Sequence, residues 1–300
     1  MQIKTMLTEL GDKSVLSPLS SEQEKELKTL LLTMCIDIMD FCEKKGLLCM
    51  LGGGTALGAV RHKGFIPWDD DIDLNMPRED YNRFISLFSE GFQGKYDLFV
   101  PDGTRMAATL SAKVSIPGTI LEDIFHAGDP IKLGVNLDIF PIENVPDNKI
   151  AATIKGHLCD ALRKAVVSAY YYQCRSDKMK ALFYGSKKTK VVYNARCLVG
   201  FLMSWKSYQW WFAKYDKFVQ TKGKTKKITI PTGRKNYFGE MMDWDTVFPL
   251  KKAEFEGHQF NVYGKVEEYL TMLYGDYLQL PPEDKREKHF YTNVKLKREH

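Results

Sequence analysis

The sequence lacks several features that would each define a class of protein. Its six cysteines form no Cys-x-x-Cys pair, which argues against a zinc site, and a disulfide framework would be unusual in a chain of 300 residues. The longest apolar run, Cys197 to Met203, is far shorter than the roughly 18 to 20 residues of a membrane-spanning helix. Met1 to Leu16 shows no secretory-signal pattern. We therefore expect a cytoplasmic protein with at most peripheral contact to the inner face of a membrane.

A strong excess of one charge is also missing. The 43 basic and 38 acidic residues leave a formal net charge of +5. That balance suits an anionic small-molecule substrate or weak attraction to an anionic membrane surface, and it predicts no nucleic-acid partner. Hydrophobic residues make up 44% of the chain and charged residues 27%, as in ordinary globular proteins.

The hydrophobic pattern divides the chain into three parts. Residues 1–148 alternate helices with short strands, residues 149–230 are helical in pattern, basic and aromatic, and residues 231–300 contain a further strand and helix. A capping box at Ser21 and Glu24 predicts the start of the first long helix, which should end near Gly46. The pattern predicts an α+β fold, in which a helical insertion interrupts a core of a small mixed sheet flanked by helices. The C-terminal segment should pack back on that core.

Acidic residues gather where one of these strands is predicted. Asp71 and Asp73 are two residues apart, so on a strand both carboxylates would face the same side, and Asp69 would join them if the strand began earlier. Crowded carboxylates favour a divalent cation with oxygen ligands, such as Mg²⁺. A solvated acidic loop is the simpler alternative, and an EF-hand is excluded because Leu74 stands where its glycine is needed. Asp138 stands among apolar neighbours and is either functional or a structural ion-pair partner.

A glycine run precedes the acidic residues. Gly52, Gly53, Gly54 and Thr55 follow a buried strand, where backbone amides can hold phosphate oxygens, although a tight structural turn explains the run equally well. The P-loop and dinucleotide-binding motifs do not fit. Arg61 lies between the two motifs and could clamp a diphosphate, unless it belongs to a solvated basic loop.

These residues resemble a known family. The run from Leu51 to Asp73, which includes Gly52-Gly53-Gly54-Thr55 and Trp68-Asp69-Asp70-Asp71-Ile72-Asp73, is similar to the signature of the LicD family. That family includes bacterial phosphocholine transferases and is related to the fukutin-type ribitol-phosphate transferases. Asp138-Ile139-Phe140-Pro141 and a closing segment of Tyr274-Gly275-Asp276-Tyr277, Pro281-Pro282, Lys285-Arg286 and His289 also match. The resemblance covers roughly residues 25–145 and 235–290.

The resemblance implies a nucleotidyltransferase-fold core and a reaction. A phospho-alcohol such as phosphocholine would pass from a CDP-linked donor to a hydroxyl of a glycan acceptor, which can be lipid-linked, and CMP would be released. By position, Asp71 and Asp73 carry over as ligands of Mg²⁺ or Mn²⁺ and as catalytic residues, Asp138 as the third catalytic carboxylate, and Gly53, Gly54 and Thr55 as phosphate-binding residues. Beyond the resemblance, we expect Asp69 to join the metal ligands, and Arg61, Lys113 and His289 to bind substrate.

Two alternatives remain at this point. A nucleotidyltransferase that activates a sugar or alcohol phosphate with CTP or ATP, and releases pyrophosphate, would use the same carboxylates. The basic, aromatic region of residues 149–230 could form an acceptor groove or simply pack as helices, and Trp205, Trp210 and Trp211 would suit a membrane surface.

Overall fold

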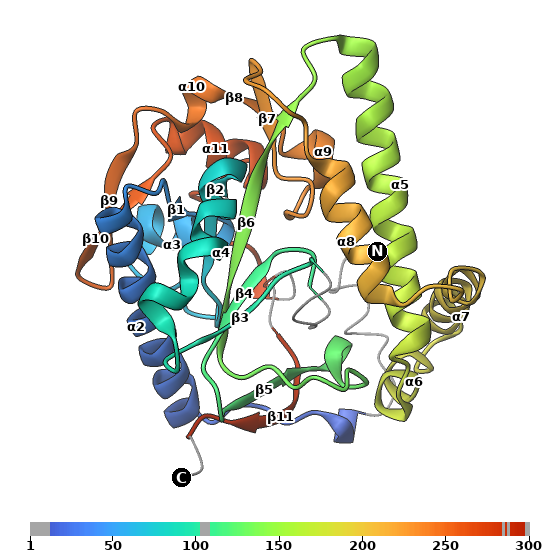
Figure 1. Ribbon diagram of the computed structural model, residues 1–300. Coiled ribbons are helices and arrows are strands. Elements are labelled where there is room, and N and C mark those ends of the chain that lie inside the picture. The colour runs from blue at the N-terminus through green and yellow to red at the C-terminus, as the bar shows by residue number, and fades with distance from the viewer. Residues whose placement is uncertain (1–12, 103–108, 284–285, 287–288, 298–300) are drawn as a thin grey trace.

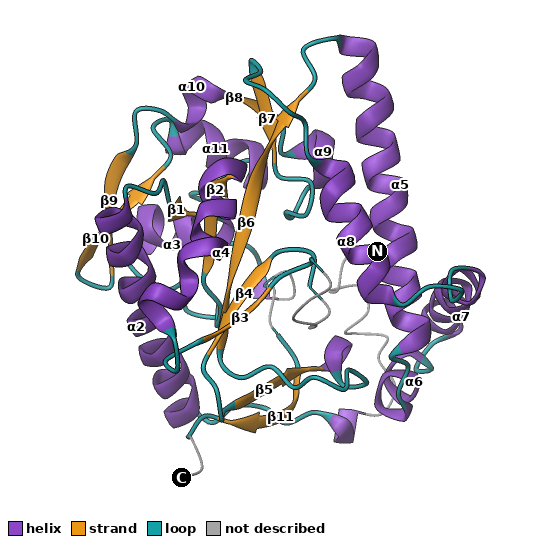
Figure 2. Ribbon diagram, in the orientation of Figure 1, coloured by secondary structure: helices purple, strands orange, loops and turns teal. Residues whose placement is uncertain are grey.

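A computed structural model describes the chain except for residues 1–12, 103–108, 284–285, 287–288 and 298–300. Most of the N-terminal segment Met1 to Leu16, and Lys285 of the closing segment, therefore lie outside the described residues. The described residues mix helices and strands around a curled mixed sheet (Figures 1 and 2). The predicted combination of helices with a small mixed sheet is confirmed.

The central sheet brings together strands that are distant in the sequence. Its main path runs in the order β1 (Met50–Leu51), β2 (Asp73–Pro77), β6 (Asn136–Val145), β4 (Ala112–Ser115) and β3 (Asp97–Phe99). Strands β2 and β6 are parallel, and the other pairs on this path are antiparallel. Strand β6 is long enough to pair at its far end with β7 (Lys227–Thr229), which pairs in turn with β8 (Met242–Asp243).

Two smaller antiparallel pairs lie outside this sheet. Strand β9 (Lys251–Phe255) forms a hairpin with β10 (His258–Val262). Strand β5 (Ile120–Asp123) pairs with β11 (Tyr291–Lys295), which returns from the C-terminal end of the chain (Figure 1).

The helices form two groups. One group is close to the sheet and comprises α2 (Ser21–Lys45), α3 (Gly53–His62), α4 (Arg78–Phe92), α10 (Trp244–Val247) and α11 (Val266–Tyr274). The other lies between β6 and β8 in the chain and comprises α5 (Lys149–Gln173), α6 (Asp177–Phe183), α7 (Lys187–Leu202), α8 (Tyr208–Val219) and α9 (Asn236–Gly239). Short 3₁₀ turns occur at η1 (Lys13–Val15) and η2 (Ile124–His126). Within the described part of the chain, no helix is both long enough and apolar enough to cross a bilayer.

The first long helix shows a small correction to the sequence analysis. Its capping box is made by Ser20 and Gln23, one residue before the predicted pair of Ser21 and Glu24. Ser20 accepts a hydrogen bond from the Gln23 amide at 3.2 Å, and the Gln23 side chain accepts one from the Ser20 amide at 3.0 Å. Two neighbouring serines can satisfy the same motif, and tertiary packing selects the register. The helix ends at Gly46 as predicted.

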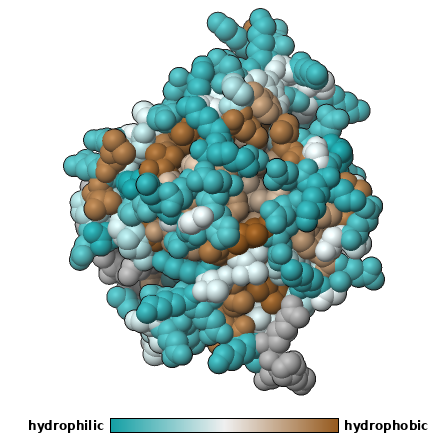
Figure 3. All heavy atoms as spheres, turned by 90° about the vertical axis from the view of Figure 1, so that its left-hand side faces the viewer, coloured by the Kyte–Doolittle hydropathy of each residue, from teal (hydrophilic) through white to brown (hydrophobic). Residues whose placement is uncertain are grey.

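Buried side chains form two hydrophobic clusters. One surrounds the central sheet and includes Tyr263, Tyr269 and Tyr291 from the C-terminal segment, so this segment does pack on the core. The other is built mainly from the helices α5 to α8. On the side that carries α2 and the β9–β10 hairpin, hydrophilic side chains cover most of the surface and apolar ones show in patches between them (Figure 3).

A buried ion-pair group connects the two clusters. Arg78, at the start of α4, contacts Glu143 of β6 and lies 2.9 Å from Asp216 of α8. The side chains of Arg78 and Glu143 are only 12% and 1% exposed, so each charge depends on its partner. This group fixes the sheet relative to the helical region.

Candidate active site at the glycine turn and the acidic residues

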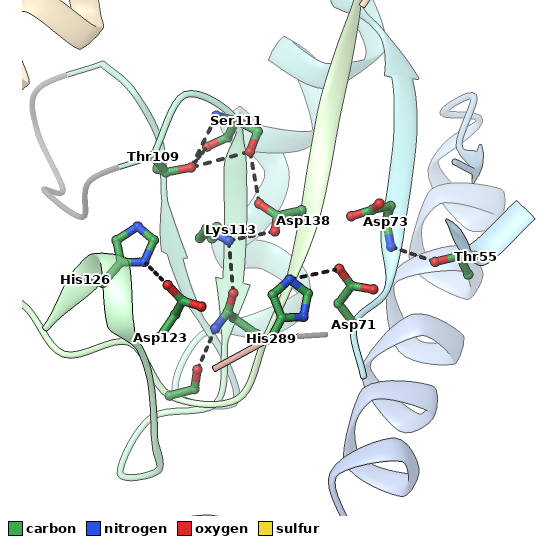
Figure 4. A network of polar contacts seen from close by, with 12 residues as sticks. Thr55, Asp71, Asp73, Thr109, Ser111, Lys113, Asp123, His126, Asp138 and His289 are labelled. Carbon is green, nitrogen blue, oxygen red and sulfur yellow. Dashed lines mark hydrogen bonds and ion pairs between the residues drawn. The ribbon is translucent and has the colours of Figure 1, made fainter. Parts of the chain in front are cut away.

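Strand register explains why three charged residues meet on one face of the sheet. Asp73 of β2 is paired with Asp138 of β6, and Asp138 is paired with Lys113 of β4. Residues that are directly opposite on neighbouring strands point to the same face. The side chains of Lys113, Asp138 and Asp73 are therefore consecutive across three strands (Figure 4).

Asp138 is held by two donors. Its Oδ2 lies 2.6 Å from Lys113 Nζ, and its Oδ1 accepts a hydrogen bond from Ser111 Oγ at 3.0 Å. Lys113 Nζ also donates to Asn136 Oδ1 at 3.2 Å. The sequence left open whether Asp138 is functional or a structural ion-pair partner. The structure gives it an ion pair, but one that faces a cavity beside other carboxylates.

The glycine turn lies directly against two of the acidic side chains. A Cβ atom added to Gly53 would be 2.7 Å from Asp73 Oδ2, and one added to Gly54 would be 2.8 Å from Asp69 Oδ2. Gly53 also has a φ of +46°, in the left-handed region that disfavours other residues. Because Gly53 and Gly54 have no side chains, the carboxylates can lie directly against the first turn of α3. The run is thus a close approach between backbone and carboxylates, and it also begins a helix.

Neighbouring polar groups hold this turn in place. Tyr269 of α11 accepts a hydrogen bond from the Gly53 amide at 3.0 Å, and Asn75 Nδ2 donates to the Tyr269 hydroxyl at 3.3 Å. The Thr55 hydroxyl accepts a hydrogen bond from the Asp73 amide at 2.8 Å. The Gly53 amide is therefore engaged, whereas first-turn amides in general lack helical acceptors, which leaves Gly54 and Thr55 to offer N–H groups to an anion. Tyr269 and Asn75 were not identified from the sequence.

The acidic residues raise each other's pKa. Burial, then the charges of Asp71, Asp138 and Asp69, hold the pKa of Asp73 well above its usual value. Burial and the charge of Asp71 do the same for Asp69. These shifts mean that ionising the whole cluster is costly without a nearby cation.

Asp71 is near the cluster for a different reason from the one predicted. Strand β2 begins at Asp73, so Asp71 lies in the preceding loop, and strand alternation does not place it. The prediction of a shared strand face was wrong for this residue. Asp71 nevertheless lies near the cluster, because it lines the same cavity as Asp138 and its Oδ2 is 3.7 Å from His289 Nε2.

The C-terminal segment contributes His289. Its Nδ1 lies 2.6 Å from Asp70 Oδ1, and its Nε2 lies 3.7 Å from Asp71 Oδ2 (Figure 4). Burial alone would lower the pKa of His289, but the hydrogen bond to Asp70 and the charge of Asp71 raise it well above its usual value. Asp70 also accepts a hydrogen bond from the Tyr291 hydroxyl at 3.0 Å. This role of Asp70 was not predicted, and its place within the acidic run is the signal that the sequence offers for it.

Arg61 is engaged by the chain itself. Its Nη1 donates to the Tyr277 carbonyl at 2.7 Å, and Nε donates to His62 Nδ1 at 3.3 Å. The guanidinium thus anchors the segment after α11 to α3. A phosphate-binding role for Arg61 stays a prediction.

A cavity of about 250 Å³ opens beside the carboxylates. Asp71, Asp138 and Lys113 line one part of it, and Phe125, His126 and Leu133 line another. His289 and Tyr291 also line it, which means that the wall includes the last strand of the chain. Asp69 and Asp73 do not line it and face the glycine turn instead. The carboxylates therefore separate two spaces, the cavity and the glycine turn.

The chemistry of the donor set fits a divalent cation with oxygen ligands. Asp69, Asp71 and Asp73 supply only carboxylate oxygens, which Mg²⁺ and Mn²⁺ prefer. Within the described residues, no three histidine, cysteine or acidic side chains already converge as a metal-binding group, so these side chains would turn inward on binding. The metal site stays a prediction.

A carboxylate cluster facing the glycine turn of a helix N-terminus, with a paired lysine, is suited to chemistry on phosphate esters. Residues 46–115, which contain the glycine turn, Asp69 to Asp73 and Lys113, match the family model described as "LicD/FKTN/FKRP, nucleotidyltransferase domain". A lipopolysaccharide cholinephosphotransferase, LicD, of Haemophilus influenzae is 29% identical over 274 residues, which cover 85% of this chain and 93% of that protein. An uncharacterized protein of Rickettsia typhi is 42% identical over 74 residues, which cover 23% of this chain and 24% of that protein.

The chain is similar to the LicD family in both comparisons: residues 46–115 match the family model, and the LicD protein of Haemophilus is similar over 85% of the chain. The similarity to the Haemophilus protein extends over most of both chains, so it includes the helical region and the C-terminal segment as well as the acidic cluster.

Proposed function

We propose that this protein is a LicD-like phosphotransferase with a nucleotidyltransferase-type core. It would move a phospho-alcohol, phosphocholine or a similar group, from a CDP-linked donor to a glycan hydroxyl. The observation that carries this proposal is the alignment of Lys113, Asp138 and Asp73 across three strands, with Asp73 and Asp69 against the glycine turn. The relative from Haemophilus, named for phosphocholine transfer to lipopolysaccharide, supports the choice of reaction.

In this proposal Asp69, Asp71 and Asp73 would hold Mg²⁺ or Mn²⁺. Such an ion would neutralise charge on the diphosphate and on the departing CMP. The amides of Gly54 and Thr55 hold a phosphate oxygen on the glycine side. Lys113, which Asp138 and Asn136 hold in place, binds an oxygen of the transferred phosphate.

The acceptor enters from the cavity, which Asp138 lines and Asp73 does not. The acceptor oxygen attacks the phosphorus that carries the alcohol, a new phosphorus–oxygen bond forms, and the bond to the bridging oxygen breaks. The bridging oxygen leaves on CMP with the bonding electron pair. Asp138 takes the proton of the acceptor hydroxyl and returns it to solvent. The acceptor glycan, which can be lipid-linked, would be met at the cytoplasmic face of a membrane.

Donor binding tests the proposal without requiring the acceptor. Calorimetric titrations with CDP-choline, CDP-ribitol and CDP-glycerol, in Mg²⁺ and again in EDTA, should show metal-dependent binding of one donor. Asp71→Asn should weaken this binding and reduce CMP release by about 100-fold or more, because a displaced cation leaves the diphosphate charge uncompensated. Asp40 is an exposed acidic residue on α2, so Asp40→Asn is the matched control and should change neither donor binding nor CMP release.

The same titrations distinguish phospho-alcohol transfer from the alternative nucleotidyltransferase reaction. If the protein bound CTP but none of the CDP-linked donors, and released pyrophosphate, it would be a nucleotidyltransferase and not a phospho-alcohol transferase. Normal activity of Asp71→Asn, with an unchanged circular dichroism spectrum, would contradict the assigned site.

A further inference from the structure

Helix α7 exposes an apolar ridge to solvent. The ridge consists of Val191, Leu198, Phe201, Leu202 and Trp205, with exposed fractions of 65%, 61%, 55%, 68% and 65%. The spacing from residue 191 to 198 and 202 keeps these side chains on one side of α7, and Trp205 follows in the turn after the end of that helix. Scattered exposed apolar residues are normal, but five large ones within fifteen positions form a continuous strip.

The ridge is not the side that folds the helix into the protein. Tyr193 and Gly200 are buried on the opposite side, where the Tyr193 ring stacks on Phe183 of α6 with centroids 5.1 Å apart. Helix α7 packs against α5 at Gly200, where an added Cβ would meet the Ser168 carbonyl, and the Phe201 ring at the edge of the ridge lies 5.6 Å from the Tyr172 ring of α5. The helix therefore has a complete internal contact face, and the ridge remains available to a partner.

The segment of the chain that carries the ridge contains only positive charges. Residues 178–215 contain eight basic residues and no acidic residue. Lys187, Lys188 and Lys190 are exposed in the first turns of α7. Cations at a helix N-terminus oppose the helix dipole, at a cost of about 0.3–1 kcal/mol each. Lysines at an unfavourable position suggest a partner that is negatively charged.

Aromatic and basic side chains also gather at the other end of the ridge. The Trp205 ring lies 5.8 Å from that of Trp210 and 5.2 Å from that of Trp211. Lys206 Nζ lies 5.8 Å and Lys214 Nζ 5.1 Å from the Trp210 ring centroid. Tryptophan and lysine together are typical of groups that sit at the headgroup level of a bilayer.

We propose that the α7 ridge binds the surface of an anionic lipid bilayer, with its aliphatic and aromatic side chains inserted and its lysines on the lipid headgroups. A nucleic acid would use the lysines but not the exposed leucines, valine and phenylalanine. A second copy of this chain would bring two strongly basic surfaces together, which is unfavourable. An anionic bilayer matches both the apolar strip and the charge.

Ring contacts connect this surface to the cavity. Tyr193 of α7 stacks on Phe183, and Phe183 lies 6.1 Å from Phe125, which lines the cavity. Lys178, at the edge of the basic region, lies 3.5 Å from Glu122 in the cavity wall. A protein bound through α7 would hold the cavity in a defined orientation to the bilayer, as a lipid-linked acceptor requires.

Vesicle binding tests this inference, and it needs no donor nucleotide. The full chain is mixed with vesicles of phosphatidylcholine alone, or with 30% phosphatidylglycerol, and the bound fraction is measured by flotation. Binding to the anionic vesicles should fall about 100-fold for Lys187→Gln, Lys188→Gln and Lys190→Gln combined. The pair Phe201→Gln and Leu202→Gln should lower it about tenfold or more.

A matched control is available on α5. Ile150 and Ile154 are 72% and 56% exposed, and α7 lies beside the opposite end of that helix (Figure 1). The pair Ile150→Gln and Ile154→Gln should bind vesicles as the wild type does. Fluorescence of Trp205 should be quenched by brominated lipids, and the quenching should decrease in Trp205→Phe.

The results show whether the α7 ridge binds a bilayer or a second copy of the chain. Equal binding to neutral and anionic vesicles, no binding, or equal losses in the α5 and α7 variants would each overturn the inference. A dimer in solution that Phe201→Gln and Leu202→Gln dissociate, without vesicle binding, would assign the ridge to a second copy. Because the readout is binding alone, failure of the proposed transfer reaction would leave it unaffected.

Discussion

Substitution of Gly53 by alanine tests whether the glycine turn exists to bring backbone and carboxylate together. The alanine Cβ would lie 2.7 Å from Asp73 Oδ2, closer than carbon and oxygen atoms approach without a bond. The backbone at φ +46° would add strain of about 1–2 kcal/mol for a residue with a side chain. We expect both a loss of stability and a displacement of Asp73.

The magnitude follows from the geometry. The carboxylate must move by about 0.5–1 Å to restore normal contact, and displacements of that size cost about 10- to 100-fold in catalytic rate. The variant should therefore release CMP about 10- to 100-fold more slowly, while the free energy of unfolding falls by about 1–2 kcal/mol. A CMP-release assay and urea denaturation followed by circular dichroism measure the two effects.

Gly94 provides the matched control. It has a φ of +75°, and a Cβ there would meet no atom within 4 Å. Gly94→Ala should lose similar stability and keep its activity. If Gly53→Ala were as active as Gly94→Ala, the close approach to Asp73 would have no catalytic meaning and the reasoning would be refuted.

Three further substitutions test the framework around the site. Arg78→Met leaves the Glu143 carboxylate buried without its partner and should lower the free energy of unfolding by about 3–5 kcal/mol, or the melting temperature by about 6–15 °C; an unchanged melting temperature would show that the ion pair contributes nothing. Tyr269→Phe removes the acceptor of the Gly53 amide and should cost about 1–2 kcal/mol in urea denaturation, and no loss would mean that the bond is dispensable. Burial raises the pKa of Glu240 from 4.5 to about 7, so its contribution to stability is complete below pH 4.5 and is lost as the pH rises through about 7. Between pH 4.5 and 7, the free energy of unfolding of the wild type should fall by about 3 kcal/mol more than that of Glu240→Gln. If the free energies of unfolding of the two proteins changed with pH in parallel, the raised pKa of Glu240 would be contradicted.

Local signals in the sequence predicted much of the fold. The first long helix ends at Gly46 as predicted, a strand begins within the acidic run, and the C-terminal segment contains the predicted strand and helix. Each depends on features within a few neighbouring residues, such as a cap, a glycine or a hydrophobic period. The position of the capping box at Ser20 was missed by one residue, because the competing serine at 21 offers the same chemistry.

The hydrogen-bond and ion-pair partners within the site are brought together by tertiary contacts, which no local sequence pattern predicts. Lys113 meets Asp138 because two antiparallel strands pair in one register, and their separation in the sequence does not reveal that register. The Tyr269 hydroxyl reaches the Gly53 amide across more than two hundred residues. The family resemblance could indicate that Asp71, Asp73 and Asp138 belong together, but not that Asp70 holds His289.

The pairing of β11 with β5 has a consequence for how the protein is made. Strand β5 leaves the ribosome early, but its partner β11 follows about 170 residues later, after the whole helical region. His289 and Tyr291, which complete the cavity wall, arrive with it. The acidic cluster, which is complete once Asp138 is made, therefore stays open on one side for about half of translation, and its closure depends on contacts of high sequence separation, which form slowly. A translation product that stops before residue 289 would carry Asp71, Asp73 and Asp138 without the wall that encloses them, so catalysis would begin only after synthesis of these residues.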